Sequence, residues 1–478
     1  MRAPSPALPI ADPDRPWLGR VLRMPGGRPF LRLWSALSIS VVGDQVTAVA
    51  VPTLAILALG AGPFEVGLLS AGTWIAWPVL GPIAGVWVDR LPRRPVLVAC
   101  DLARMTLLLS IPIAGALGVL GFPQLLAVVA AAGIANVFFD LAFTAHVPEV
   151  VERRDIPVAN TRLEASRSGS YVAGPSLAGA LIGLVGAPLA VVLDAASFLA
   201  SAVLIRSSGP TRFRRGVASA PRSAASAASA ASAVAAVAVG SSDARSLRRD
   251  LAEGLDVLRR QPVLLRLVVA AALSNFGLVA ARALLLLHLY RDLGFTPALA
   301  GLVLAAPGVG ALAGVGLAGW IGRRVGVGRA LLLATVLESA VWLVIPVATG
   351  PLAAIVVAVA LAASSVWGLV WNVLAQSVRQ VAVDSSIQGR VAAIRGAIGF
   401  GVIPLGGLAG GAIGQALASA GLPALPITIA IGALVGTSSG LVMLGGSTAA
   451  LARWRFGDPW PGRDDVQAAA PEEAPAGG

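Results

Sequence analysis

Residues 66–94 read VGLLSAGTWIAWPVLGPIAGVWVDRLPRR. The first 23 of these residues carry no charge, whereas four of the last six are charged. A helix needs about 20 consecutive apolar residues to cross the hydrocarbon core of a membrane. The stretch therefore predicts a transmembrane helix that ends at a charged membrane surface.

Twelve segments of the chain are apolar and long enough to span a membrane. They cover residues 33–59, 66–88, 95–119, 123–145, 167–186, 188–206, 263–288, 297–320, 327–349, 352–376, 391–416 and 422–446. Of the 478 residues, 56% are hydrophobic and only 13% are charged, against about 25% charged in soluble proteins. The composition excludes a soluble enzyme, a disordered protein and a disulfide scaffold. It predicts an all-α, polytopic membrane protein with twelve transmembrane helices.

Arginine residues are segregated to alternate connections between these segments. They gather in the N-terminal tail, in the central loop, and after the second, fourth, eighth and tenth segments. Because cytoplasmic loops are rich in Lys and Arg, both termini and the central loop are expected in the cytoplasm. The predicted domains are a cytoplasmic tail (1–32), a six-helix bundle (33–206), an Ala/Ser-rich cytoplasmic loop (207–262), a second six-helix bundle (263–446) and a cytoplasmic tail (447–478).

The rarer residues exclude several kinds of chemistry. All 36 basic residues are Arg, so the chain lacks the Lys that a P-loop ATPase or a Schiff-base mechanism requires. Because His146, His288 and the single Cys100 are far apart, no metal site, internal disulfide or cofactor is expected. The net charge of +12 is dispersed between apolar segments, which indicates membrane topology and not nucleic-acid binding.

The two halves of the chain repeat at an offset of 234 residues. Pro63-x-x-x-Gly67-Leu68 matches Pro297-x-x-x-Gly301-Leu302, and Ser40-x-x-Gly43 matches Ser274-x-x-Gly277. Two parallel six-helix repeats joined by a long loop are the organisation of rocker-type secondary transporters. Two pseudo-symmetric bundles around one central site are therefore predicted.

The stretch Gly85-Val-Trp-Val-Asp89-Arg90-Leu-Pro-Arg93-Arg94 closely resembles the loop 2–3 signature of the major facilitator superfamily. It departs from that signature at Pro92, where many members have Gly. Further motifs are similar to the drug-exporter branch that includes macrolide-efflux and enterobactin-exporter-like proteins. They are Asp101-Leu-Ala-Arg104, Gly174-Pro175-x-x-x-Gly179, Asp194-Ala-Ala-Ser-Phe198 and Gly389-Arg390-Val391. The resemblance covers about residues 30–446.

The loop signature is expected to work as a conformational latch. A carboxylate is stabilised at a helix N-terminus, so Asp89 is predicted to meet the start of the eleventh segment near Gly389–Arg395. Arg90, Arg93 and Arg94 can pair with carboxylates or lipid phosphates; the alternative is that they only set topology.

Two further motifs lie within the predicted helices. Asp101 and Arg104 lie on one helix face and are expected to form a structural pair. Gly174, Pro175 and Gly179 indicate either a simple kink or a bend used in alternating access.

The resemblance implies that segments 1, 4, 7 and 10 line a central cavity, where polar residues are the first candidates for function. They are Asp44, Asn136, Asp140, Asn275, Arg282, Trp371 and Asn372. Asp44 is the candidate for proton coupling, and the alternative is a permanent pair with an Arg. Arg282 is expected either to attract an anionic substrate or to pair with Asp44. Asp194 and Glu338 are expected to be packing or interfacial residues.

Three functions follow from these features. The first is proton-coupled export of a small amphipathic molecule, such as a drug, a macrolide-like compound or a siderophore, from a bacterial cytoplasm by a monomer in the cytoplasmic membrane. The second is import or facilitated diffusion of a metabolite through the same fold. The third is a membrane scaffold or sensor without transport. Membrane lipid is the expected environment, and an enzyme is the least expected outcome because no catalytic constellation appears.

Overall fold

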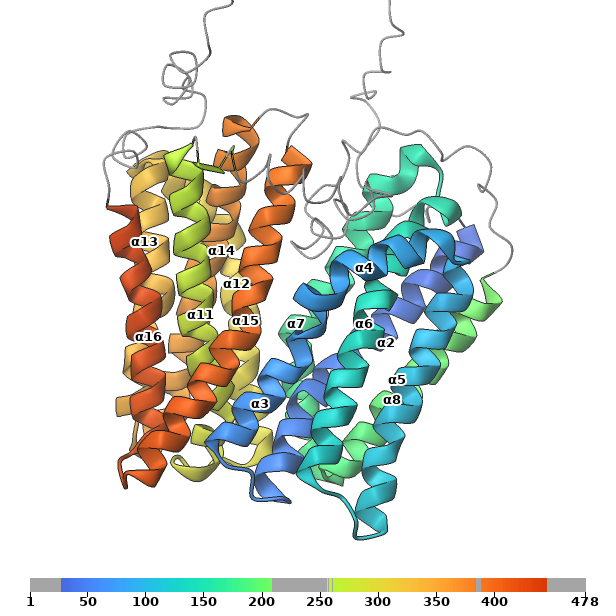
Figure 1. The fold of residues 1–478 in the computed structure, drawn as a ribbon, viewed down its shortest axis with the longest axis horizontal. Coiled ribbons are helices and arrows are strands. Elements are labelled where there is room, and N and C mark those ends of the chain that lie inside the picture. The colour runs from blue at the N-terminus through green and yellow to red at the C-terminus, as the bar shows by residue number, and fades with distance from the viewer. Residues whose placement is uncertain (1–26, 209–255, 257, 260, 384–387, 445–478) are drawn as a thin grey trace, which may run out of the picture.

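The computed structural model describes residues 27–208, 256, 258, 259, 261–383 and 388–444. Within this part every regular element is helical, and the helices form two bundles that lie side by side (Figure 1). The expected tails and central loop lie almost entirely outside the described residues.

The N-terminal bundle contains seven α-helices and one 3₁₀ turn. They are α2 (Gly27–Leu57), α3 (Pro63–Trp74), α4 (Ala76–Arg90), α5 (Arg93–Ala116), α6 (Phe122–Val150), η1 (Arg153–Asp155), α7 (Ile156–Val185) and α8 (Ala187–Ser207). Sharp connections use glycine: Gly186, between α7 and α8, has a φ of 81°, which residues with a side chain rarely adopt.

The C-terminal bundle repeats this plan. Its elements are α11 (Pro262–Arg291), α12 (Pro297–Val325), α13 (Val327–Ala340), η3 (Val341–Val347), η4 (Gly350–Leu352), α14 (Ala353–Ala382), α15 (Gln388–Ser419) and α16 (Ala424–Met443). Proline occupies the first turn of both α3 and α12, where its missing N–H costs nothing. These two helices start at repeat-equivalent residues, Pro63 and Pro297.

The expected all-α membrane fold is confirmed. Among the described residues, eleven helical segments are long and apolar enough to cross a membrane. The second expected segment, 66–88, is divided between α3 and α4, which meet at Ile75, and neither helix is long enough alone to be among the eleven. The ninth expected segment ends as the 3₁₀ helix η3, which contains Pro346. The helices run further than the apolar segments; α2, for example, already begins at Gly27.

The bundles touch through two pseudo-symmetric crossings, α3 on α15 and α12 on α7. A Cβ atom added to Gly67 would lie 2.6 Å from the Cα of Gly411, and one added to Gly179 would lie 2.6 Å from the Cα of Gly301. Backbone therefore packs directly on backbone at both crossings, which small residues permit between membrane helices. Gly67 and Gly301 are the same position of the internal repeat.

These contacts gather toward one end of the molecule, which we call the hairpin end because it contains the α2–α3 connection. Arg291 donates to the carbonyl oxygens of Gly60 (3.0 Å) and Ala61 (2.9 Å) there, and the hydroxyls of Thr53 and Tyr290 are 2.8 Å apart. The opposite end, where α2 begins and α16 ends, is called the tail end; the bundles diverge toward it (Figure 1).

The buried apolar side chains also differ between the hairpin end and the tail end. One cluster of buried side chains contains residues of both halves, including Leu54 and Leu284. A second cluster is formed by buried residues of the N-terminal half and a third by those of the C-terminal half. The halves thus share a core toward the hairpin end, whereas toward the tail end each has a core of its own, with Phe400 of the C-terminal half packed against the N-terminal one.

Candidate functional site

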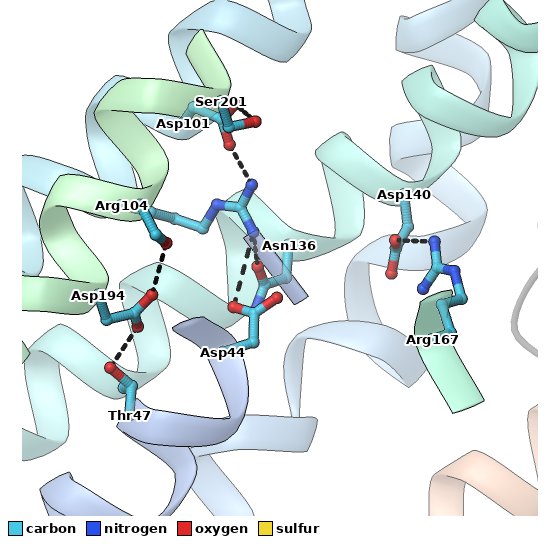
Figure 2. A network of polar contacts seen from close by, with 10 residues as sticks. Asp44, Thr47, Asp101, Arg104, Asn136, Asp140, Arg167, Asp194 and Ser201 are labelled. Carbon is cyan, nitrogen blue, oxygen red and sulfur yellow. Dashed lines mark hydrogen bonds and ion pairs between the residues drawn. The ribbon is translucent and has the colours of Figure 1, made fainter. Parts of the chain in front are cut away.

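A buried arginine, Arg104, lies at the centre of a polar network in the N-terminal bundle (Figure 2). It projects from α5, and only 2% of the residue is exposed. Its guanidinium donates to the carboxylate of Asp101, one turn earlier, and to Asn136 Oδ1 on α6 at 2.7 Å. The expected Asp101–Arg104 pair is therefore present, and Asn136 belongs to the same site.

Two aromatic rings enclose the Arg104 guanidinium. Its central carbon lies 4.3 Å from the ring centroid of Phe139 and 4.2 Å from that of Phe198. A cation over an aromatic face is attracted by the ring quadrupole, most strongly where water is excluded. The rings therefore help to hold a full charge inside the helix bundle.

Asp44 forms the accessible edge of this network. One of its carboxylate oxygens lies 3.9 Å from Arg104 Nη1, and 37% of its side chain is exposed. Asp101, by contrast, is completely buried. Asp44 thus has an arginine neighbour, which one of the two sequence interpretations required, and it also keeps about a third of its side chain exposed.

Asp194 on α8 belongs to the same region, where it is buried against α2, as expected for a packing residue. The residue is only 1% exposed, and its carboxylate accepts from Thr47 on α2 and from Ser197 at 3.0 Å. Gly43 explains the placement, because a Cβ atom there would collide with the Asp194 carboxylate. On the same helix, Ser201 donates to Asp101 at 2.7 Å.

A second ion pair lies beside the network. Arg167 on α7 and Asp140 on α6 approach to 3.3 Å, and about a third of each side chain is exposed. Figure 2 shows this pair apart from the Arg104 cluster. The N-terminal half therefore combines four membrane-embedded carboxylates with two guanidiniums among these residues.

The C-terminal half has a smaller charged site. Arg282 on α11 has Glu338 on α13 as its charged neighbour, so it does not follow the alternative of pairing with Asp44. The central carbon of its guanidinium lies 5.8 Å from the Trp342 ring. A Cβ atom on Gly368 would lie 2.6 Å from Glu338 Oε1, so this carboxylate packs directly on the backbone of α14.

The other cavity candidates of this half are placed differently. Trp371 is 8% exposed and belongs to the apolar core of the C-terminal half. Asn372 is exposed and donates to the carbonyl oxygen of Gly368 at 2.9 Å. Asn275 on α11 is partly exposed.

The basic residues of the loop signature tie helices of one half together. Arg93 Nη1 lies 2.6 Å from Glu149 Oε1 at the end of α6, and Arg94 donates to the carbonyl oxygen of Ile205 on α8 at 3.0 Å. Arg90 is exposed and Gly85 is buried. The predicted latch falls on Asp89 and on residues 388–390, which lie in helices but whose side chains the structure does not describe.

The motif in α7 is a packing surface for two neighbours. A Cβ atom on Gly174 would lie 2.5 Å from Gln45 Cγ on α2, and Gly179 meets α12 at the crossing described above. The helix continues through Pro175 from Ile156 to Val185. These glycines therefore allow α7 to lie close to α2 in its own bundle and to α12 in the other bundle.

A family model described as Major Facilitator Superfamily matches residues 33–407. The chain belongs to this superfamily. It is therefore a membrane transporter of this type, and the superfamily part of the sequence resemblance is confirmed. The further resemblance to the drug-exporter branch stays a prediction.

A curated relative and several solved structures are similar to this transporter. The "Uncharacterized MFS-type transporter YfiS" of Bacillus subtilis (strain 168) is 25% identical over 282 residues, which are 59% of this chain and 61% of that protein. The crystal structure of the nucleoside transporter NupG matches with a TM-score of 0.69 and 11% identity, over 87% of this chain and 98% of that one.

A bacterial homologue of the iron transporter ferroportin matches in two states. The inward-facing crystal structure gives a TM-score of 0.66 at 16% identity, and the outward-facing one gives 0.53 at 17%. Both matches cover 87% of this chain and 98% of the other. Likenesses at these identities show the fold.

Sequence reasoning missed part of the N-terminal network. Thr47, Ser201 and Phe139 gave no signal of their own, because Thr, Ser and Phe are common in membrane helices. Phe198 was noticed only as the last residue of the motif Asp194-Ala-Ala-Ser-Phe198. Asp194 did give a signal, since carboxylates inside membrane segments are rare and are usually functional. It was expected to be a packing or interfacial residue, and its place beside the Arg104 network was not predicted.

Proposed function

We propose that this transporter exports a small amphipathic molecule by alternating access, driven by protons. The observation that carries the proposal is the polar network around Arg104. Asp44, Asp101 and Asp194 all lie near a single guanidinium inside a membrane bundle.

The charge balance of this cluster supports proton coupling. Three ionised carboxylates around one guanidinium would leave two uncompensated negative charges, and such charges are costly inside a membrane. Binding of protons removes this excess. Asp44 is the residue placed to exchange protons with solvent, because its side chain is partly exposed whereas Asp101 and Asp194 are buried.

The arrangement of the two bundles supports alternating access. The direct contacts between halves lie toward the hairpin end, and the chain is more similar to the inward-facing than to the outward-facing ferroportin homologue. With the arginine-rich connections in the cytoplasm, the tail end is the cytoplasmic end of a protein in a bacterial cytoplasmic membrane. The conformation described is then inward-facing.

Transport by energised membrane vesicles tests this function. Vesicles that contain the transporter are expected to move one or more compounds from a panel of amphipathic dyes, antibiotics and siderophores in the export direction. An uncoupler should abolish the accumulation. Accumulation that survives the uncoupler, or movement only in the import direction, would contradict the proposal.

The loop signature is proposed to latch the two halves together at the tail end when the transporter faces outward. Asp89→Ala is then expected to reduce export several-fold while the protein remains inserted, because the outward-facing state loses a contact at the α15 N-terminus. Export assays and surface labelling measure the two effects separately. Unchanged export by Asp89→Ala would rule out the latch.

A further inference from the structure

A cavity lies at the hairpin end, where the two halves meet. Its volume is about 510 Å³, which is within the range of small-molecule sites. Pro63 of the N-terminal half lines it, together with residues from the end of α11, the end of η3 and the connection between α15 and α16. Every residue of the lining lies in the described part of the chain.

The walls of this cavity are mostly apolar. They include Leu287, Leu293, Pro346, Leu422, Leu425 and Pro426. The polar side chains of the lining are His288, Arg291, Asp292 and Thr349. Apolar walls with a few polar groups are typical of sites that bind small organic molecules.

The pair of His288 and Asp292 supplies hydrogen-bond acceptors. His288 Nδ1 lies 2.7 Å from Asp292 Oδ2. Because a carboxylate accepts, the imidazole donates through Nδ1–H, and the neutral ring then carries a lone pair on Nε2. His288 is only 3% exposed, and its Nε2 is buried without a hydrogen-bond partner. A buried acceptor without a donor costs free energy, so this pair favours a ligand that brings a donor.

The charge at the cavity favours a cation. Asp292 keeps 38% of its side chain exposed, so its carboxylate is accessible. The neighbouring Arg291 donates to the carbonyl oxygens of Gly60 and Ala61, and its guanidinium is thus directed at the α2–α3 connection. Metal sites usually need three or four protein ligands, and no group of three or more His, Cys, Asp or Glu gathers in the described residues.

We propose that this cavity binds an organic cation with an apolar body and a protonated amine. The ammonium group pairs with Asp292 and donates to His288 Nε2, and hydrogen bonds assisted by charge are the strong ones. The apolar body lies against the leucine and proline side chains of the walls. The site is separate from the Arg104 network, and binding there depends neither on the direction nor on the coupling of transport.

Thermal unfolding of the purified full-length protein tests the site. Adamantylamine, adamantanol and adamantane carboxylate share one apolar cage and provide a cation, a neutral molecule and an anion at neutral pH. In a maltoside detergent at constant ionic strength, wild type is expected to gain roughly 2–4 °C in Tm at saturating amine. The gain with the alcohol or the carboxylate should be clearly smaller.

Two pairs of variants locate the binding. Asp292→Asn should bind the amine roughly tenfold more weakly, because it loses the charge of the acceptor. Glu152→Gln, the same loss of charge at an exposed residue after α6, should bind it like wild type. Ala418→Phe fills the cavity from an exposed position and should abolish binding. Ala416→Phe is its control, because Ala416 is exposed on the same helix but outside the lining.

Several results would overturn the proposal. They are no response of wild type, an equal gain with adamantanol, a larger gain with the carboxylate, and wild-type affinity in Asp292→Asn or Ala418→Phe. Isothermal titration calorimetry gives the same comparison for a variant whose own Tm is changed. Because these assays involve no transport, their result is independent of the export assay.

Discussion

The two halves of the transporter place opposite charges at equivalent positions. Arg104 and Glu338 are 234 residues apart, the same offset that relates Gly67 to Gly301. Arg104 is enclosed by Phe139 and Phe198 and bound by Asp101. Glu338 packs on Gly368 and has Arg282 as its charged neighbour.

The repeat therefore preserves backbone contacts and not polar chemistry. Glycines at the two bundle crossings are constrained because backbone meets backbone there. Buried charges can differ between halves as long as each finds compensation within its own bundle. The proposed proton coupling accordingly belongs to the N-terminal half, where carboxylates exceed guanidiniums, and the balanced pair of the C-terminal half is proposed to have a structural role.

The largest expected effect comes from Arg104→Ala. This change leaves Asp101 fully buried without its ion-pair partner, which should cost about 3–5 kcal/mol of unfolding free energy. Denaturation in mixed micelles by SDS titration measures the loss. Arg282→Ala in the other half is the matched comparison and should cost clearly less, because Arg282 is exposed. Equal losses would contradict the expected difference between the buried Arg104 and the exposed Arg282.

A smaller loss of unfolding free energy is expected from substitutions at the two bundle crossings, where the halves are alike. A Cβ atom on Gly179 would lie 2.6 Å from the Cα of Gly301 and 2.7 Å from the carbonyl oxygen of Pro297, so Gly179→Ala must push the bundles apart. The expected cost is roughly 1–3 kcal/mol, and Gly67→Ala should behave in the same way.

Spin labels report this separation directly. Cysteines introduced at the exposed positions Ala58 and Leu422, with Cys100→Ser, carry the labels at the hairpin end of each half. Gly179→Ala and Gly67→Ala should lengthen or broaden the distance distribution. Gly169→Ala is the control on α7, because a Cβ atom there meets nothing within 4 Å. If the distance distribution were unchanged in both Gly179→Ala and Gly67→Ala, the close backbone packing at these two crossings would not hold the bundles together.

The smallest effect is expected from Ser201→Ala. It removes one hydrogen bond of 2.7 Å to Asp101 and leaves the Arg104 contact in place, which should cost about 1–2 kcal/mol. SDS titration provides the measurement, with the exposed Ser207→Ala on the same helix as control. A cost equal to that of Arg104→Ala would place the serine, and not the arginine, at the centre of the network.

The sequence predicted the fold well because apolar length and arginine segregation directly reflect the thickness and charge asymmetry of a membrane. The offset of 234 residues also identified glycines that prove to be bundle contacts. Helix boundaries were less accurate: the break at Ile75 and the start of α2 at Gly27 depend on packing.

The candidate site was predicted only in part. Spacing along one helix was sufficient for Asp101 and Arg104, which are three residues apart. Contacts between helices could not be predicted in this way, so the contact of Asp194 with Thr47 was missed, and Asp44 was one of the two partners considered for Arg282. Such contacts depend on how α8 approaches α2 across Gly43, and no local pattern encodes that approach.

Transport against a gradient by Asp44→Asn tests the central claim most directly. Proteoliposomes under an imposed pH gradient are given the compound identified in the vesicle assay, and wild type, Asp44→Asn and Glu338→Gln are compared. Asp44→Asn is expected to equilibrate the compound without accumulating it at any pH, whereas Glu338→Gln should still accumulate it. Accumulation by Asp44→Asn with the pH dependence of wild type would contradict proton coupling through the N-terminal network.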